Sequence, residues 1–254
     1  MYEDVKYLLY VVGGVGLALA VLRLFRRRRA SGMSIAERTL FATNYGYFTT
    51  LYTFFLGFAV VSLWQDYNRA DEAITNESDL LVVEYRLSLS VPGARPLRLA
   101  LLDYVDYVSE AGWGNMRSGG SSDGADARYE RIWDRLREAD PGDGPGHRAY
   151  DRMLDRLIEL NRLRHQRLLL IDGNLYAPIW GIIYMGVLFT IAGFYFIETD
   201  RRSADIFFMC MMLAMVLGNI FLLYELDTPF SGLISIDPVK FVKAAAAMRT
   251  LGGL

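Results

Sequence analysis

Residues 45–64 read YGYFTTLYTFFLGFAVVSLW, a run of 20 residues without Asp, Glu, Lys or Arg. About 20 apolar residues are what a helix needs to cross the roughly 30 Å hydrocarbon core of a bilayer. The sequence continues without a break into residues 65–90, where Ala70, Ile74 and Leu81 recur at helical spacing. This stretch therefore predicts one long helix that leaves the membrane and ends near Val91-Pro92-Gly93.

Three further blocks are similarly apolar: residues 7–25, 175–197 and 206–224. Because the lipid core offers no hydrogen-bond partners to an open backbone, each isolated span is expected to be a helix. The first block is followed directly by Arg26–Arg29, so we interpret it as a retained anchor and not as a cleaved signal peptide. The predicted fold class is all-α: an integral membrane protein with four transmembrane helices and an extramembrane helical bundle between the second and the third.

This pattern divides the chain into four expected parts. Residues 1–64 hold transmembrane helices 1 and 2 with a basic loop, residues 65–174 form the extramembrane helical region, residues 175–226 hold transmembrane helices 3 and 4, and residues 227–254 form a re-entrant or interfacial C-terminal segment. Apolar residues at helical spacing predict the helices of the extramembrane region. These helices cover about 96–111, 127–138 and 148–171, with a Gly- and Ser-rich loop over 112–127.

The short loops carry the basic residues that orient membrane proteins. Arg26–Arg29 and Arg38 lie between the first and second spans, and Arg201 and Arg202 lie between the third and fourth. Cytoplasmic loops are enriched in Lys and Arg, which predicts that the N-terminus and residues 65–174 lie outside the cytoplasm. Basic residues also flank the opposite ends of the spans, at lower density. The 24 Arg against 3 Lys favour a GC-rich genome, and so a multi-pass protein of a bacterial inner (plasma) membrane.

Composition excludes several classes of chemistry. Cys210 is the one cysteine and there are two histidines, so neither a Cys cage nor a His-rich metal site is expected. The formal net charge of −2 gives no sign of nucleic-acid binding. No candidate nucleophile has a nearby base. We therefore expect no catalytic residue, no metal, no cofactor and no enzyme activity.

Small and hydroxyl side chains follow one stripe of the second span. Such a stripe either lines a pore or allows another helix to approach closely, and the sequence leaves both alternatives open. The pore-lining candidates are Gly46, Thr49, Thr50, Thr53 and Gly57.

Two acidic residues lie on the otherwise apolar face of the helix that follows. Glu77 and Glu84 are seven positions apart, on the same face as Ile74 and Leu81. A buried carboxylate needs a partner, so one interpretation is an ion pair with an arginine of a neighbouring helix, such as Arg162 or Arg167. The other is a ring of carboxylates at the vestibule of an oligomeric pore.

Three stretches together resemble the bestrophin-like domain family of bacterial integral membrane proteins. They are LGFA through Trp64 to VEYR (56–86), RHQRL followed by Pro178-Ile179-Trp180, and YELDTPFSG followed by IDP (224–238). The last stretch is the most specific, since the family pattern is similar to Leu-Asp-x-Pro-Phe-x-Gly. The structural motif residues are Trp64, Trp180, Asp227, Pro229, Phe230, Gly232 and Pro238.

The resemblance implies a homo-oligomeric membrane channel or channel-like protein. Its second span would conduct small ions, with anions as one candidate, and its partners would be the lipid bilayer and further copies of the chain. The alternative is a non-conducting membrane scaffold or sensor whose extramembrane helical domain binds a partner. Subunit number, selectivity and gating do not follow from the residues.

The C-terminal segment is expected to be ordered. Residues 229–232 turn the chain, and Phe230 folds back against apolar surface. Asp237 and Pro238 predict an N-cap with proline at the first helical position. The predicted helix runs to about Arg249, and its Val239, Val242 and Ala246 are expected to face the bundle.

Overall fold

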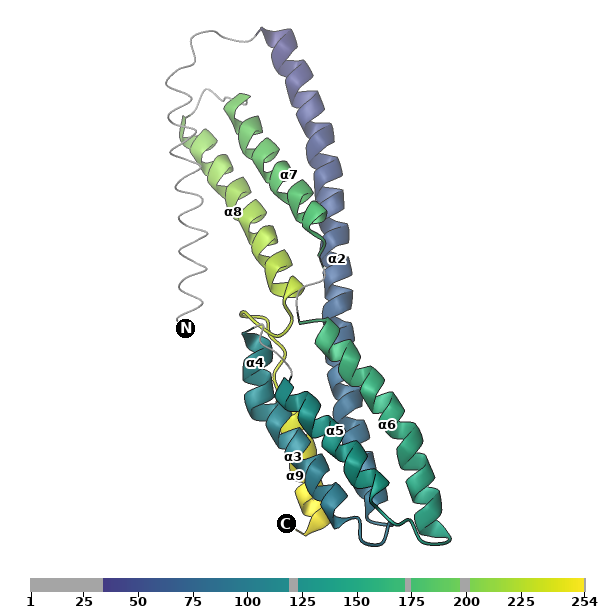
Figure 1. The fold of residues 1–254 in the computed structure, drawn as a ribbon. Coiled ribbons are helices and arrows are strands. Elements are labelled where there is room, and N and C mark those ends of the chain that lie inside the picture. The colour runs from purple at the N-terminus through teal and green to yellow at the C-terminus, as the bar shows by residue number, and fades with distance from the viewer. Residues whose placement is uncertain (1–33, 119–122, 172–174, 197–201, 254) are drawn as a thin grey trace. The chain divides into compact units, whose positions relative to one another are not determined.

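The computed structural model describes residues 34–118, 123–171, 175–196 and 202–253, and every regular element within these ranges is helical (Figure 1). The expected first span and Arg26–Arg29 lie outside these residues. The described elements, in chain order, are α2 (Ile35–Ser88), α3 (Arg95–Tyr107), a π-helical turn (Val108–Gly112), α4 (Trp113–Arg117), α5 (Asp123–Arg137), α6 (Pro145–Leu169), α7 (Ala177–Phe196), α8 (Arg202–Asp227) and α9 (Val239–Gly252).

The chain forms two compact units. The first comprises residues 1–65 and 174–227, and its described helices are the first part of α2 together with α7 and α8. The second comprises residues 66–173 and 228–254, and it holds the rest of α2 with α3, α4, α5, α6 and α9. Helix α2 thus contributes to both units.

The long helix that the sequence predicts is confirmed. Helix α2 is continuous over 54 residues and ends at Ser88. It begins with a capping box, in which the Ser34 N–H donates to Glu37 Oε2 at 2.8 Å and the Glu37 N–H donates to Ser34 Oγ at 3.2 Å. After α2 ends, Gly93 adopts φ +70°, a conformation that glycine reaches without a Cβ clash.

Two of the described helices are long and apolar enough to cross a membrane. These are α2 and the part of α8 from Phe207 to Asp227. The apolar part of α7, Ala177–Gly193, is shorter. Length and composition therefore support the second and fourth expected spans, whereas the first and third remain expectations.

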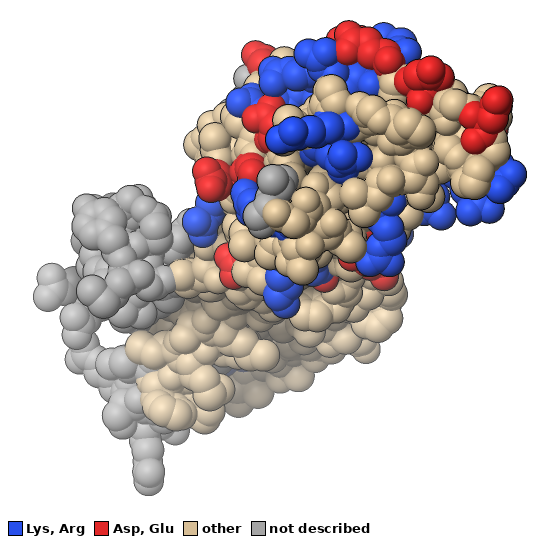
Figure 2. All heavy atoms as spheres, turned by 90° about the horizontal axis from the view of Figure 1, so that it is seen from below, with Lys and Arg blue, Asp and Glu red and all other residues tan. Residues whose placement is uncertain are grey.

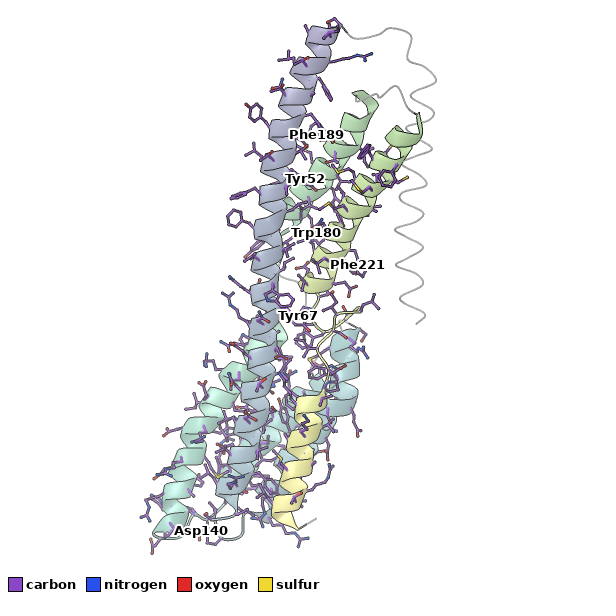
Figure 3. The ribbon with its side chains drawn as sticks, turned by 180° about the vertical axis from the view of Figure 1, so that it is seen from behind. Tyr52, Tyr67, Asp140, Trp180, Phe189 and Phe221 are labelled. Carbon is purple, nitrogen blue, oxygen red and sulfur yellow. The ribbon has the colours of Figure 1, made fainter. Side chains whose placement is uncertain are left out.

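In the first unit, α7 packs on α2 through tyrosines that meet glycines. One of these tyrosines, Tyr52, is labelled in Figure 3. The Tyr52 hydroxyl donates to the Ile183 carbonyl at 2.8 Å, and a Cβ added at Gly186 would overlap the Tyr52 ring. The Tyr45 ring contacts Gly193 in the same way. Glycines let a neighbouring helix approach this closely, so α7 supplies the small residues of this contact and α2 the large ones.

The predicted loop over 112–127 is wrong at both ends. Helix continues from α3 through the π-helical turn into α4, and α5 already begins at Asp123. Trp113 holds this segment in place, because its buried indole N–H donates to the Ile236 carbonyl at 3.2 Å. Its ring packs edge-on against Phe230 at 5.7 Å between ring centroids. Burial of one large aromatic side chain outweighs the weak helix propensity of the glycines beside it.

Helix α9 packs within the core of the second unit, on a face that differs from the predicted one. The helix begins at Val239 with Pro238 as its N-cap residue, and no side chain caps it. Val239 and Val242 are about half exposed, whereas Phe241 and Met248 are fully buried. The register follows from Phe241, whose ring lies 6.0 Å from that of Trp113.

The α2–α7 contact makes a testable prediction. Gly186→Ala should destabilise the protein by about 1–3 kcal/mol, because the new Cβ overlaps the Tyr52 ring and overpacking costs energy of this order. Gly181→Ala on the same helix is the matched control, since a Cβ there meets no heavy atom within 4 Å. Thermal unfolding of both variants in detergent measures the difference. Equal stability of the two would contradict the described contact.

Candidate functional site

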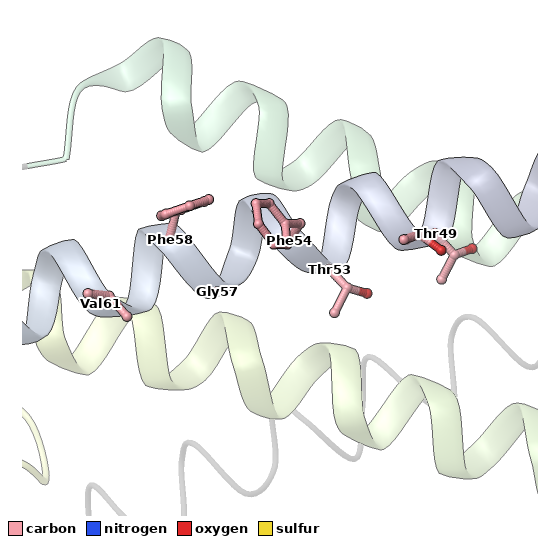
Figure 4. Close-up of a pocket in the computed structure, with 7 residues that line it drawn as sticks. Thr49, Thr53, Phe54, Gly57, Phe58 and Val61 are labelled. Carbon is pink, nitrogen blue, oxygen red and sulfur yellow. The ribbon is translucent and has the colours of Figure 1, made fainter.

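The open face of α2 carries a groove of about 620 Å³ in the first unit (Figure 4). Every residue that lines this groove belongs to α2, so no other described helix closes it. The lining side chains are hydroxyl, aromatic and aliphatic, and glycine opens the middle of the groove. The residues are Thr49, Thr50, Thr53, Phe54, Gly57, Phe58 and Val61.

Most of the predicted pore-lining residues lie in this groove. Thr49, Thr50, Thr53 and Gly57 line it, and Gly46 is exposed one turn before Thr50. A Cβ added at Gly46 or Gly57 meets no heavy atom within 4 Å, so within the described chain this stripe packs against nothing. The small residues that do pack helices in this unit are those of α7, which the sequence analysis did not single out.

Two threonine hydroxyls of the groove bond to the backbone of α2. Thr50 Oγ1 donates to the Gly46 carbonyl at 2.9 Å, and Thr49 Oγ1 donates to the Tyr45 carbonyl at 2.8 Å. A hydroxyl has one hydrogen and two lone pairs. Because the hydrogen is used within the helix, the lone pairs are what these two side chains offer to a ligand.

The aromatic part of the groove was not among the predicted site residues. Phe54 and Phe58 are 68% and 63% exposed, and their rings pack edge-on with centroids 4.9 Å apart. Their exposure in the structure shows that hydroxyl and aromatic residues share one wide open face.

In the second unit, the exposed side of α2 is polar and carries charges of both signs. Asn68, Glu72, Asn76 and Asp79 are all exposed. Arg69 and Arg86 are exposed on the same stretch of α2.

The first of the two predicted acidic residues forms a buried ion pair. Arg167 of α6 donates from Nε to Glu77 Oε2 at 2.7 Å and from Nη2 to Oε1 at 3.1 Å. The Tyr104 hydroxyl of α3 donates to the same Oε1 at 2.7 Å. Burial and the Glu77 carboxylate raise the pKa of Tyr104, so this hydroxyl keeps its proton. Burial alone would lower the pKa of Arg167, but the facing carboxylate raises it further, so the guanidinium stays charged.

Glu84 and Arg162 behave differently from this pair. Glu84 is fully buried, and among the described residues neither of its carboxylate oxygens has a hydrogen-bond partner. Burial raises the pKa of Glu84 to about 8. Arg162 is exposed and pairs with Glu159 three positions earlier. Neither buried glutamate therefore belongs to the exposed side of α2 in the second unit, which carries the carboxylates of Glu72 and Asp79.

The residues of the C-terminal motif form local contacts that join neighbouring segments of the chain. Asp227 Oδ1 accepts the Leu175 N–H at 2.8 Å and Oδ2 accepts the Trp180 indole N–H at 3.3 Å, which joins the end of α8 to the start of α7. The predicted turn is present, with Gly232 at φ +86° and the Ile236 N–H donating to the Pro229 carbonyl at 2.9 Å. Phe230 is buried, as predicted, whereas Trp64 is half exposed.

Charges on the face of the molecule seen from below are mixed. Figure 2 shows acidic and basic side chains interspersed there. Charged residues of the second unit pair with each other, such as Arg131 with Asp103 and Arg135 with Glu138. The described residues contain no group of three or more His, Cys, Asp or Glu that could hold a metal ion.

The described residues are helical in every regular element, and two of their helices are long and apolar enough to cross a membrane. The Bestrophin-like domain model matches residues 10–241, and the chain belongs to this family. No curated protein matches the sequence.

Solved structures share the fold. A structure described as a membrane protein, a variant with one glycine replaced by alanine, superposes with a TM-score of 0.70 at 13% identity, covering 97% of this chain and 98% of that chain. A bacterial bestrophin homologue from Klebsiella pneumoniae, with one isoleucine replaced by threonine, gives 0.66 at 14% identity, covering 97% and 98%. Another variant of that homologue, with one leucine replaced by threonine, gives 0.64 at 13% identity, covering 98% and 100%.

The buried ion pair gives a second prediction. Arg167→Met leaves the Glu77 carboxylate and the Tyr104 hydroxyl in the core without their cation, and should cost about 3–5 kcal/mol of stability. Arg162→Met, on the same helix, removes an exposed pair and should leave the unfolding temperature nearly unchanged. Thermal unfolding in detergent compares the two. An equal drop in the unfolding temperature of both variants would show that the buried pair contributes no more to stability than the exposed pair.

Proposed function

We propose that the chain assembles as a homo-oligomer in the bacterial inner membrane and conducts small ions along the open face of α2. The observation that supports this most is the groove over residues 49–61, which is lined by one helix and covered by no other described one. Copies of α2 arranged around an axis would turn this face into the wall of a path. Membership of the Bestrophin-like domain family agrees with a channel-like membrane protein.

The exposed carboxylates of α2 in the second unit would favour cations over the anions that the sequence analysis allowed, whereas the exposed Arg69 opposes this preference. Glu72 and Asp79 are exposed there, and in an oligomer each would form a ring of carboxylates. The lone pairs of the Thr50 hydroxyl also favour a cation. Arg86 also offsets part of this charge.

Planar-bilayer recording of the purified full-length protein tests conduction and its selectivity. Glu72→Gln combined with Asp79→Asn should lower the ratio of cation to anion permeability, read from the reversal potential in a KCl gradient. Glu110→Gln, an exposed acid of the π-helical turn, is the control and should leave the ratio unchanged. Thr53→Leu should reduce conductance while assembly, measured by light scattering, stays intact.

Two outcomes would contradict this proposal. No conductance with any of several ions would favour the non-conducting scaffold or sensor. If Thr53→Leu breaks the oligomer instead, the stripe packs helices of neighbouring copies, because a contact built on small residues cannot admit the added volume.

The proposed orientation makes a separate prediction. In a background in which Cys210 is replaced by Ser, Asp143→Cys should react with a membrane-impermeant maleimide on intact cells, because residues 65–174 are proposed to lie outside. Arg38→Cys should react only after permeabilisation. Both positions are exposed in the structure, so both should react once the membrane is opened. Labelling in the opposite order would reverse the orientation.

A further inference from the structure

Two glutamates of α2 lie seven positions apart in the core of the second unit, in very different surroundings. Glu77 and Glu84 are both 0% exposed. Glu77 accepts hydrogen bonds from Arg167 and Tyr104. Both oxygens of Glu84 are buried without any hydrogen-bond partner in the part of the chain that the structure describes. A buried carboxylate in this position is unfavourable as an anion and tolerable as a neutral acid.

The groups that act on Glu84 come from two neighbouring helices. On α6, Arg156 is exposed, and its charge opposes part of the effect of burial without forming an ion pair with Glu84 in the structure. On α5, Tyr129 lies close enough for the charge of Glu84 to act on it, but its hydroxyl already donates to the Leu157 carbonyl at 2.8 Å. On α3, the Tyr104 hydroxyl donates to Glu77. None of these groups bonds to the Glu84 carboxyl.

Neutral and ionised Glu84 therefore demand different packing. The neutral acid fits the apolar core that α2 shares with α5 and α6, where Ile132, Leu157 and Leu160 are also buried. The ionised form must gain water or a cation. Arg156 is the cation whose charge already acts on Glu84, although no ion pair joins the two in the structure.

We propose that Glu84 is a proton-operated switch in the second unit: its neutral form holds α6 on α2, and its ionisation draws Arg156 and water into the core and loosens that packing. The proposal concerns this unit alone and does not depend on whether the chain conducts ions.

The pH dependence follows from the two protonation equilibria. Burial raises the pKa of Glu84 to about 8, whereas the exposed carboxyl of an opened or unfolded chain has its ordinary pKa of 4.5. Stability from the neutral form is therefore complete below pH 4.5 and is lost as the pH rises towards 8. Over this window the constant for opening that exposes Glu84 should rise about tenfold per pH unit, and it should level off above about pH 8.

Hydrogen exchange of the full-length protein in detergent, corrected for the intrinsic pH dependence of exchange, measures this opening in α6. Glu84→Gln keeps the shape of the neutral acid but cannot ionise, so its opening constant should not change with pH. Glu130→Gln, an exposed acid on α5, is the matched control and should keep the wild-type slope. Arg156→Gln should move the levelling-off to higher pH, because the charge that favours ionised Glu84 is gone.

Infrared spectroscopy measures the protonation of Glu84 directly, so this test does not depend on the stability of the variants. The infrared carbonyl band of a protonated carboxylic acid should be present at about pH 7 in wild-type protein, absent in Glu84→Gln, and should vanish with a midpoint near pH 8. A slope in Glu84→Gln equal to that of the wild type, a flat wild-type profile, or no such band at neutral pH would each overturn the proposal.

Discussion

The second unit is organised around a deeply buried cation. Arg167 of α6 is 2% exposed, and a charge at that depth persists only if anionic and polar groups surround it. Glu77 of α2 and Tyr104 of α3 supply those groups, Met116 of α4 accepts a hydrogen bond from Nη1, and the Phe241 ring of α9 lies 5.6 Å away. One guanidinium thus fixes the register of five helices, whereas apolar packing alone would allow them to slide.

Parts of the fold that depend on local pattern could be predicted from the sequence. The helical period runs unbroken from residue 45 into the 80s, so one long α2 and its end near Gly93 follow from spacing and turn chemistry. The pairing of Glu77 with an arginine of α6 was one of two interpretations, because an acid on an apolar stripe needs a partner. Spacing also placed four of the five candidate pore residues on what is now the groove.

What the sequence could not predict depends on contacts between distant residues. Glycines and serines around Trp113 indicate a loop, and only the carbonyl of Ile236, far along the chain, makes a helical turn there favourable. The buried face of α9 follows from the same tryptophan, which packs against Phe241. In the sequence, Glu84 looks like Glu77: both are acids on an apolar helix face. The sequence does not show that the neighbours of Glu84 on α5 and α6 offer it no hydrogen-bond donor.

The two sides of α2 explain how one helix can serve two environments. Its inner side packs wherever the chain provides a neighbour, through Tyr52 in the first unit and through Ile74 and Leu81 in the second. Its outer side has no neighbour within the described chain and changes from threonine and phenylalanine to asparagine and charged residues of both signs after Trp64. Contact with lipid explains the exposed phenylalanines, but it does not explain the exposed glycine and threonine residues between them. These open positions are the observation on which the proposed path for ions rests.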